Sequence, residues 1–139
     1  MVLNYVRALV ATLLMVGAAV GVFADQSQIK PAVRAAAQSY FDALRSGDTT
    51  ALLALFAGTE RSRNQIQLSD PTYSQFLLDR YRNARFEVSG AGVNSGISFV
   101  DVRIWISDAE SFRERLVLQP SSGPANATLH IVARKELDQ

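Results

Sequence analysis

The stretch YFDALRSGDTTALLALFAG, residues 40–58, contains the clearest pair of helix signals in this chain. Apolar residues recur at helical spacing from Gln28 to Ser46, and Gly47 is typical of a helix end. Asp48 can then accept amide hydrogen bonds at the start of a second helix. The pattern predicts helices over 28–46 and 49–57, with Gly58 ending the second. Because the connection is so short, the two helices must fold back on each other.

The segment that follows is predicted from its turn residues. Residues 59–68, TERSRNQIQL, are polar and weakly patterned, which predicts a loop with room for a short strand near residues 65–68. Asp70-Pro71 opens a third helix, since Asp suits the N-cap and Pro suits the first helical position. One face of that helix carries the apolar residues Tyr73, Phe76, Leu77 and Tyr81.

From Ala84 onward the apolar period changes from 3.6 to 2, which predicts strands over 85–93, 97–107, 111–119 and 127–135. Helices followed by an antiparallel meander predict an α+β domain with sequential strand order. We expect the sheet to curve around the N-terminal helices and to enclose a cone. A pocket can form at the mouth of such a cone.

The N-terminus has the pattern of an export signal. Arg7 precedes an uncharged run of 16 residues, 8–23, and Val22 and Ala24 stand at the −3 and −1 positions of a cleavage site. The pattern predicts a signal peptide over 1–24, cleavage after Ala24, and a single periplasmic or secreted domain over 25–139. The alternative is a retained membrane anchor, but the run is short against the roughly 20 residues that span a bilayer.

Composition excludes several classes of protein. The chain has no cysteine, so it has no lipoprotein anchor, disulfide framework or thiolate site. Loss of Arg7 with the signal reduces the number of Lys+Arg residues from 14 to 13, which equals the 13 Asp+Glu residues and gives a net charge of zero. A nucleic-acid binder should show a basic excess, so the composition does not favour one. His130 is the only histidine, and the chain has no Gly-rich phosphate loop, so we expect neither a metal nor a cofactor.

The motif Tyr40-x-x-Ala43-Leu44-x-x-Gly47-Asp48, with Ala54-Leu55-Phe56-Ala57 after it, resembles the opening of the nuclear transport factor 2-like superfamily. This group includes ketosteroid isomerases and polyketide cyclases. The resemblance covers roughly twenty residues. It implies a cone-shaped, cystatin-like roll of helices in a curved antiparallel sheet, and a homodimer formed through the sheet. The superfamily hosts several chemistries and plain binding, so the fold does not settle function.

The ketosteroid isomerase pattern implies roles for three positions. Tyr40 corresponds to the tyrosine that donates a hydrogen bond to an oxyanion, and Glu114 is the candidate for the protonated acid on a late strand. The general base would fall at Asn64, an amide that cannot accept the proton. Glu60, the nearest carboxylate, lies a full turn too early. The sequence leaves catalysis open and favours a non-catalytic domain.

Glu114 alternates with Phe112, Leu116 and Leu118, so it should point to the apolar side of its strand. A carboxylate there has either a raised pKa or a cationic partner. A cross-strand pair with Arg103, after a one-residue change of register, would supply that partner. Tyr40 likewise has two interpretations, a pocket residue or a core tyrosine with a satisfied hydroxyl.

Three functions remain. The first is an exported accessory domain that binds a small apolar ligand, in a pocket lined by Tyr40, Phe41, Phe56, Tyr81, Val102, Ile104 and Glu114. The second is a small isomerase- or cyclase-type enzyme that acts on an apolar carbonyl substrate through Tyr40 and Glu114. The third is a protein-interaction module that uses the outer sheet face, with Asp101, Arg103 and Trp105 as its interface.

Two further groups are open to interpretation. His130 should share a half-exposed face of the last strand with Thr128, Val132 and Arg134. A set of arginines flanks the third predicted helix and forms either an anion site or a solvated rim paired with Glu60, Asp79 and Glu87. This set is Arg61, Arg63, Arg80, Arg82 and Arg85.

Overall fold

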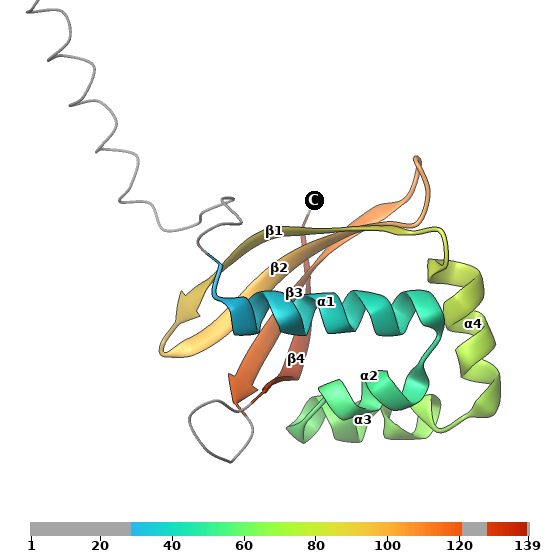
Figure 1. The fold of residues 1–139 in the computed structure, drawn as a ribbon, viewed down its shortest axis with the longest axis horizontal. Helices are drawn as coiled ribbons and strands as arrows, with labels where there is room; N and C mark the ends of the chain where they lie inside the picture. The colour runs from blue at the N-terminus through green and yellow to red at the C-terminus, as the bar shows by residue number, and fades with distance from the viewer. Residues whose placement is uncertain (1–28, 121–127, 139) are drawn as a thin grey trace, which may run out of the picture.

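The computed structural model describes residues 29–120 and 128–138, which form four helices and then four strands (Figure 1). The helices are α1 (Pro31–Ser46), α2 (Thr49–Leu55), α3 (Gly58–Leu68) and α4 (Pro71–Tyr81). The strands are β1 (Arg85–Asn94), β2 (Ile97–Trp105), β3 (Ser111–Pro120) and β4 (Leu129–Leu137). The α+β class is confirmed. The predicted signal peptide, residues 1–24, lies outside the described residues, and none of the described helices is long and apolar enough to cross a membrane.

The helix ends form as their capping residues predict. Gly47 ends α1 in the left-handed conformation, with φ of 63°, and Asp48 Oδ1 accepts a hydrogen bond from the Ala51 amide at 2.9 Å. Asp70 caps α4, in which Pro71 takes the first position. The second helix ends at Leu55, two residues before the predicted end, because Phe56 is extended and forms a parallel bridge with Ile131.

The prediction of a loop over residues 59–68 is wrong, since this segment lies within helix α3. The buried residues of α3 are Glu60 and Leu68. A helix that buries a carboxylate beside a single leucine shows little apolar periodicity, so the sequence pattern does not indicate it. Glu60 contacts Arg134 of β4, and Leu68 packs in the hydrophobic core.

The strands form one open antiparallel sheet in the order β1-β2-β3-β4, which confirms the predicted sequential meander. Ser95 and Gly96, both with positive φ, form the two-residue turn between β1 and β2. The register shifts between Val88 and Gly90 in β1, and again between Val117 and Leu118 where β3 meets β4. Each shift inserts an unpaired residue and bends the sheet locally.

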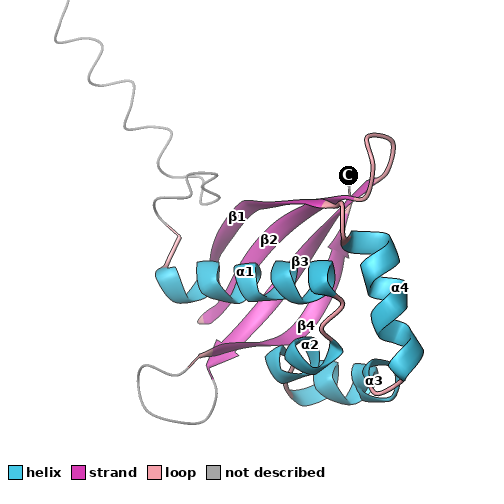
Figure 2. Ribbon diagram, turned by 45° about the vertical axis from the view of Figure 1, so that its right-hand side comes forward, coloured by secondary structure: helices cyan, strands magenta, loops and turns pink. Residues whose placement is uncertain are grey.

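The helices cover one face of the sheet, as Figure 2 shows, and we call this the inner face. Helix α1 crosses this face, and the core lies between them. The fully buried core side chains of β2 are Val100, Val102 and Ile104, as the alternation in that strand predicts. The opposite side, which we call the outer face, is covered by no element of residues 29–120 and 128–138.

Candidate functional site

Polar side chains from four elements meet between the helices and the inner face. Tyr40 comes from α1, Glu60 and Asn64 from α3, Glu114 from β3 and Arg134 from β4. We call these five residues the Arg134 cluster. Tyr40 and Glu60 are 2% and 4% exposed, so the cluster includes polar groups that are almost fully removed from water. Such groups must find partners within the protein.

Arg134 supplies most of these partners. Its Nε donates a short hydrogen bond to Glu60 Oε1, and its Nη2 donates to Asn64 Oδ1 at 3.1 Å. Asn64 Nδ2 in turn donates to Glu60 Oε1 at 3.0 Å. These contacts join α3 to β4 and satisfy the buried Glu60 carboxylate with charge-assisted bonds.

Tyr40 links this half of the cluster to Glu114. The Tyr40 hydroxyl donates to Glu114 Oε1 at 2.6 Å and accepts a longer hydrogen bond, 3.3 Å, from Arg134 Nη1. Because a hydroxyl both donates and accepts, it lies between a guanidinium and a carboxyl without conflict. The proton of Tyr40 therefore points to Glu114.

Burial and neighbouring charges shift the pKa values of Tyr40, Glu114 and Arg134. It raises the pKa of the Tyr40 hydroxyl well above the ordinary tyrosine range, and the negative charge of Glu114 adds to the effect. Burial also raises the pKa of Glu114, against the opposing effects of the Tyr40 hydrogen bond and the Arg134 charge. For Arg134, burial acts to lower the pKa, but Tyr40, Glu114 and Glu60 together raise it, so the guanidinium stays charged.

The predicted pair of Glu114 with Arg103 is wrong. Glu114 lies directly opposite Val102, and Arg103 lies opposite Arg113, so the register between β2 and β3 has no shift that would bring Arg103 to the inner face. The expectation that Glu114 points to the apolar side is confirmed by its pairing with Val102. The cation linked to Glu114 is Arg134, because the Tyr40 hydroxyl donates to Glu114 and accepts a hydrogen bond from Arg134.

The sequence does not predict the inward direction of Arg134, because a register shift inserts an extra residue, Val132, into β4. Uninterrupted alternation placed Arg134 on one face with His130 and Val132, away from Ile131. In the structure both Ile131 and Arg134 pair with inward-facing leucines of β3, so both face the helices. The assignment of Arg134 to the His130 face is therefore wrong, and the alternation of apolar residues contains no signal that reveals an inserted residue.

A cavity of about 400 Å³ borders the Arg134 cluster at Glu114. Arg80 and Glu110 form an ion pair at its edge, with 3.0 Å between Nη2 and Oε1. Glu136 pairs with Glu114 across β3 and β4 and adds a further carboxylate. The lining residues are Arg80, Glu110, Ser111, Phe112, Glu114 and Glu136. We call this opening the Glu114 cavity.

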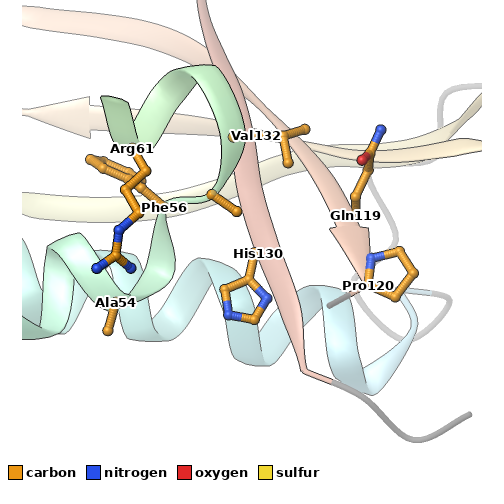
Figure 3. Close-up of a pocket in the computed structure, with 9 residues that line it drawn as sticks. Ala54, Phe56, Arg61, Gln119, Pro120, His130 and Val132 are labelled. Carbon is orange, nitrogen blue, oxygen red and sulfur yellow. The ribbon is translucent and has the colours of Figure 1, made fainter. Parts of the chain in front are cut away.

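A second cavity of about 400 Å³ lies at the start of β4, beside the connection between α2 and α3. Figure 3 shows Arg61 on one side, Gln119 and Pro120 on the other, and His130 between them. His130 is half-buried, as expected, and its Nδ1 has no hydrogen-bond partner within the described part of the chain. Arg61 donates a long hydrogen bond, 3.4 Å, to the Leu53 carbonyl.

The residues predicted to line one apolar pocket lie in several places. Tyr40, Phe41 and Phe56 are at most 5% exposed, and Val102 and Ile104 are completely buried in the core. Phe56 borders the cavity beside β4, and Phe41 packs against Phe86 in a tilted arrangement with 4.8 Å between ring centroids. Tyr81 is half-buried and packs against the core. Of the predicted pocket set, Glu114 lines the cavity that adjoins the Arg134 cluster.

The three candidate interface residues lie on the outer face. Asp101 is 4% exposed and accepts two hydrogen bonds from Arg115, at 2.7 and 2.9 Å. The guanidinium groups of Arg85 and Arg103 lie over the Trp105 ring, 5.0 and 5.3 Å from its centroid. Aromatic and cationic groups of this face are therefore already in contact with one another.

Three of the five arginines near α4 form ion pairs along the surface. Arg80 pairs with Glu110, Arg82 with Asp79, and Arg85 with Asp108. Of the predicted acidic partners, Asp79 takes that role, whereas the carboxylate of Glu60 is bound by Arg134 instead. These pairs match the solvated-rim interpretation in part, because within residues 29–120 and 128–138 Asp79 is the one predicted acid that pairs with an arginine of this set.

Comparison of the chain with protein-family models, with curated proteins and with solved structures finds no match. Among the described residues, no group of three or more His, Asp or Glu side chains is arranged to hold a metal ion. Function must therefore be argued from the Arg134 cluster and the cavities themselves.

Proposed function

We propose that this protein is an exported domain that binds a small organic ligand in the Glu114 cavity without turning it over. One observation carries the proposal. The Glu114 carboxyl is held from inside by the Tyr40 hydroxyl through Oε1, and the same residue lines an open cavity. A carboxyl fixed in this way on a rigid strand is oriented before a ligand arrives, which lowers the cost of binding.

The cavity has the size of a binding site for a small molecule. Its volume of about 400 Å³ falls in the range of about 300–1,000 Å³ that is common for ligand pockets. Phe112 offers an apolar wall, and the charged groups converge from α4, the turn before β3, and β4. This combination of an apolar surface and convergent polar groups supports ligand binding over a gap in packing.

The charges of the cavity favour a ligand with an amine or several hydroxyl groups. Glu110, Glu114 and Glu136 line it together with a single guanidinium, and that guanidinium already pairs with Glu110. Carboxylates accept hydrogen bonds and attract cations. A ligand that combines such a head group with a short apolar part therefore fits better than the wholly apolar ligand expected from the sequence.

The position that the isomerase resemblance assigns to the general base holds no free carboxylate, which favours binding over catalysis. Asn64 is an amide whose Oδ1 and Nδ2 are both hydrogen-bonded, and Glu60 is tied to Arg134. The alternative is an isomerase-type enzyme, and the contact between Tyr40 and Glu114 favours it. In that case Tyr40→Phe should abolish turnover of a carbonyl substrate while the folded structure is retained.

The binding proposal can be tested with two matched probes, hexylamine and hexanoate, which differ in the charge of the head group. We expect hexylamine to shift the amide NMR signals of residues around Glu114 at lower concentration than hexanoate does. Glu114→Gln should reduce this preference, because the amide is neutral and can still accept the Tyr40 hydrogen bond. Glu87→Gln, which changes a carboxylate on the outer face, is the matched control.

Two outcomes would contradict the proposal. One is an equal response to both probes in the wild-type protein. The other is a preference for hexylamine that Glu114→Gln leaves unchanged. Native mass spectrometry of the protein isolated from its own host adds an independent test, since a retained small molecule should be present in the wild type and absent in Glu114→Gln.

We also propose that the fold is a shallow variant of the nuclear transport factor 2-like cone and that the chain is exported after cleavage at Ala24. The helices on one face, the sequential meander and the two register shifts support the cone, because inserted residues bend strands. The apolar run after Arg7 supports export. A measured mass equal to that of a chain that begins at Asp25 would support cleavage. A mass equal to that of the chain with Met1 would contradict it.

A further inference from the structure

The outer face of the sheet carries an excess of positive charge that the composition of the whole chain conceals. Residues opposite one another across strands share a face, so the strand pairings assign the charged side chains. The acidic side chains on this face are Glu87 and Asp101. The basic side chains are Arg85, Arg103, Arg113, Arg115 and Lys135.

Some of these cations have acidic partners within the chain and others do not. Arg115 binds Asp101, and Arg85 lies 3.9 Å from Asp108. Among residues 29–120 and 128–138, no ion pair forms to Arg103, Arg113 or Lys135. Glu87 lies opposite Arg103 in the register but makes no ion pair with it. The buried Nε of Arg103 has no hydrogen-bond partner among the residues that the structure describes.

The arrangement of two of these arginines is unfavourable in the isolated chain. Arg103 and Arg113 are directly opposite each other on β2 and β3, where like charges repel. Arg113 Nη1 donates to the Asp138 carbonyl at 3.2 Å, and no carboxylate in the described part of the chain pairs with its positive charge. An anionic group placed over this pair would relieve the repulsion and supply the missing acceptors.

We propose that the outer face binds an acidic segment of a partner protein, rich in Asp and Glu, across Arg103, Arg113 and Lys135. Charge complementarity identifies the occupant, and arginine favours it, since the planar guanidinium binds carboxylates through two parallel hydrogen bonds. The surface is distinct from the Glu114 cavity, which opens on the inner face, so this inference does not depend on the proposed ligand.

Other occupants fit this surface less well. A single-stranded nucleic acid needs free aromatic faces for stacking, but guanidinium groups cover the rings of Trp105 and Phe99, the latter at 3.9 Å. A membrane surface needs aromatic or aliphatic side chains that can insert, and Trp105 is half-buried under its arginines. A second copy bound face to face would bring the same unpaired cations together.

The test uses the full chain and a fluorescein-labelled decaglutamate peptide, with binding followed by fluorescence anisotropy at low and at physiological salt. We expect binding that weakens as salt rises. Arg103→Gln/Arg113→Gln should weaken it by at least about tenfold, because both unpaired guanidinium groups are lost. Arg63→Gln/Arg82→Gln removes two cations from the helical side and should leave the affinity within about twofold, since exposed charges at a distance are screened.

Two more variants keep the test decisive. Lys135→Gln changes an exposed side chain, so it should weaken binding by about threefold without risk to the fold. Glu114→Gln should leave peptide binding unchanged, which separates this surface from the ligand site. Thermal unfolding of each variant checks that the protein is folded under the assay conditions.

Four results would overturn the proposal. The first is no binding of decaglutamate at low salt, and the second is equal weakening by the two double variants. The third is tighter binding of a ten-residue oligothymidylate or of phosphatidylglycerol vesicles than of the peptide. The fourth is a dimer, seen by analytical ultracentrifugation, that Arg103→Gln/Arg113→Gln dissociates.

Discussion

Tyr40 belongs both to the core and to the candidate site. Its ring is almost fully buried beside Phe41, and its hydroxyl lies between Glu114 and Arg134. The two interpretations of this tyrosine that the sequence leaves open are therefore compatible. A buried hydroxyl with two partners stabilises the fold, and the same hydrogen bond orients the carboxyl that borders the cavity.

Removal of this hydroxyl should destabilise the protein. Tyr40→Phe leaves Glu114 Oε1 without its donor and Arg134 Nη1 without its acceptor, and a buried group left unpaired costs about 1–3 kcal/mol. We expect a loss of that size in the free energy of unfolding, measured by urea denaturation. Tyr73→Phe, at a half-buried tyrosine of α4, should change it by less than about 0.5 kcal/mol. Equal losses in the two variants would contradict this prediction.

Glu114 should give the stability of the protein a characteristic dependence on pH. Burial raises its folded-state pKa above that of an unfolded glutamate, so protons bind more tightly to the folded chain. The resulting stabilisation is fully present below the ordinary glutamate pKa and is lost as the pH rises through the folded-state pKa. We expect the wild type to gain stability relative to Glu114→Gln as the pH falls from neutral. A difference that stays constant over this range would disprove the assignment.

At the scale of elements, the junction between α1 and α2 depends on Gly47. This residue has φ of 63°, and a Cβ atom there would lie 2.6 Å from the Ser74 carbonyl oxygen and 2.8 Å from Leu78 Cγ. Ser74 Oγ also donates to the Gly47 carbonyl at 2.6 Å, which fastens α4 to the junction. The same glycine therefore ends α1 and permits close contact with α4.

Gly47→Ala should be more damaging than the same change at another left-handed glycine. We expect a loss of about 2–4 kcal/mol in the free energy of unfolding, since the alanine meets both an unfavourable φ and a backbone clash. Gly58→Ala is the control, because Gly58 has φ of 57° but no atom within 4 Å of the place that a Cβ atom would take. That variant should lose about 1 kcal/mol from the backbone conformation alone. Similar losses for both glycines would show that the contact with α4 is unimportant.

The sheet combines two faces of opposite character. On the inner face, the one described arginine that points to the helices is satisfied by Glu60, Asn64 and Tyr40. On the outer face, arginines lie over aromatic rings, and part of their charge has no acidic partner among residues 29–120 and 128–138. The register shift in β4 decides to which of these faces Arg134 belongs, and it therefore decides whether the inner site can form.

At the scale of the whole molecule, Arg134 joins α1, α3 and β4. Arg134→Met should cost about 3 kcal/mol of unfolding free energy, the lower end for a broken buried pair, because the Arg134 side chain is 26% exposed. The loss arises chiefly from the Glu60 carboxylate, which is buried and would have no cation. Chemical denaturation gives the size of the effect.

A double substitution tests the physical cause of that loss. In Glu60→Gln/Arg134→Met the buried charge of Glu60 is removed together with its cation, so we expect much of the stability to return. Arg63→Met, at an exposed arginine of the same helix α3, is the control and should have little effect. A double variant that is as unstable as Arg134→Met would show that the guanidinium acts through packing and not through charge.

The amino-acid sequence alone determined the α+β class, the caps at Asp48 and Asp70, the turn at residues 94–96, and the inward direction of Glu114. Each follows from signals within a few residues: capping side chains, positive-φ glycines and an uninterrupted period of two. The tertiary structure decided that residues 58–68 are a helix and that Arg134 faces inward. The partners of Glu60 and Asn64 lie 74 and 70 residues away, in a strand whose alternation is interrupted by an inserted residue. Local sequence patterns depend on residues that are close along the chain. They therefore cannot predict a polar contact between residues that are distant in the sequence.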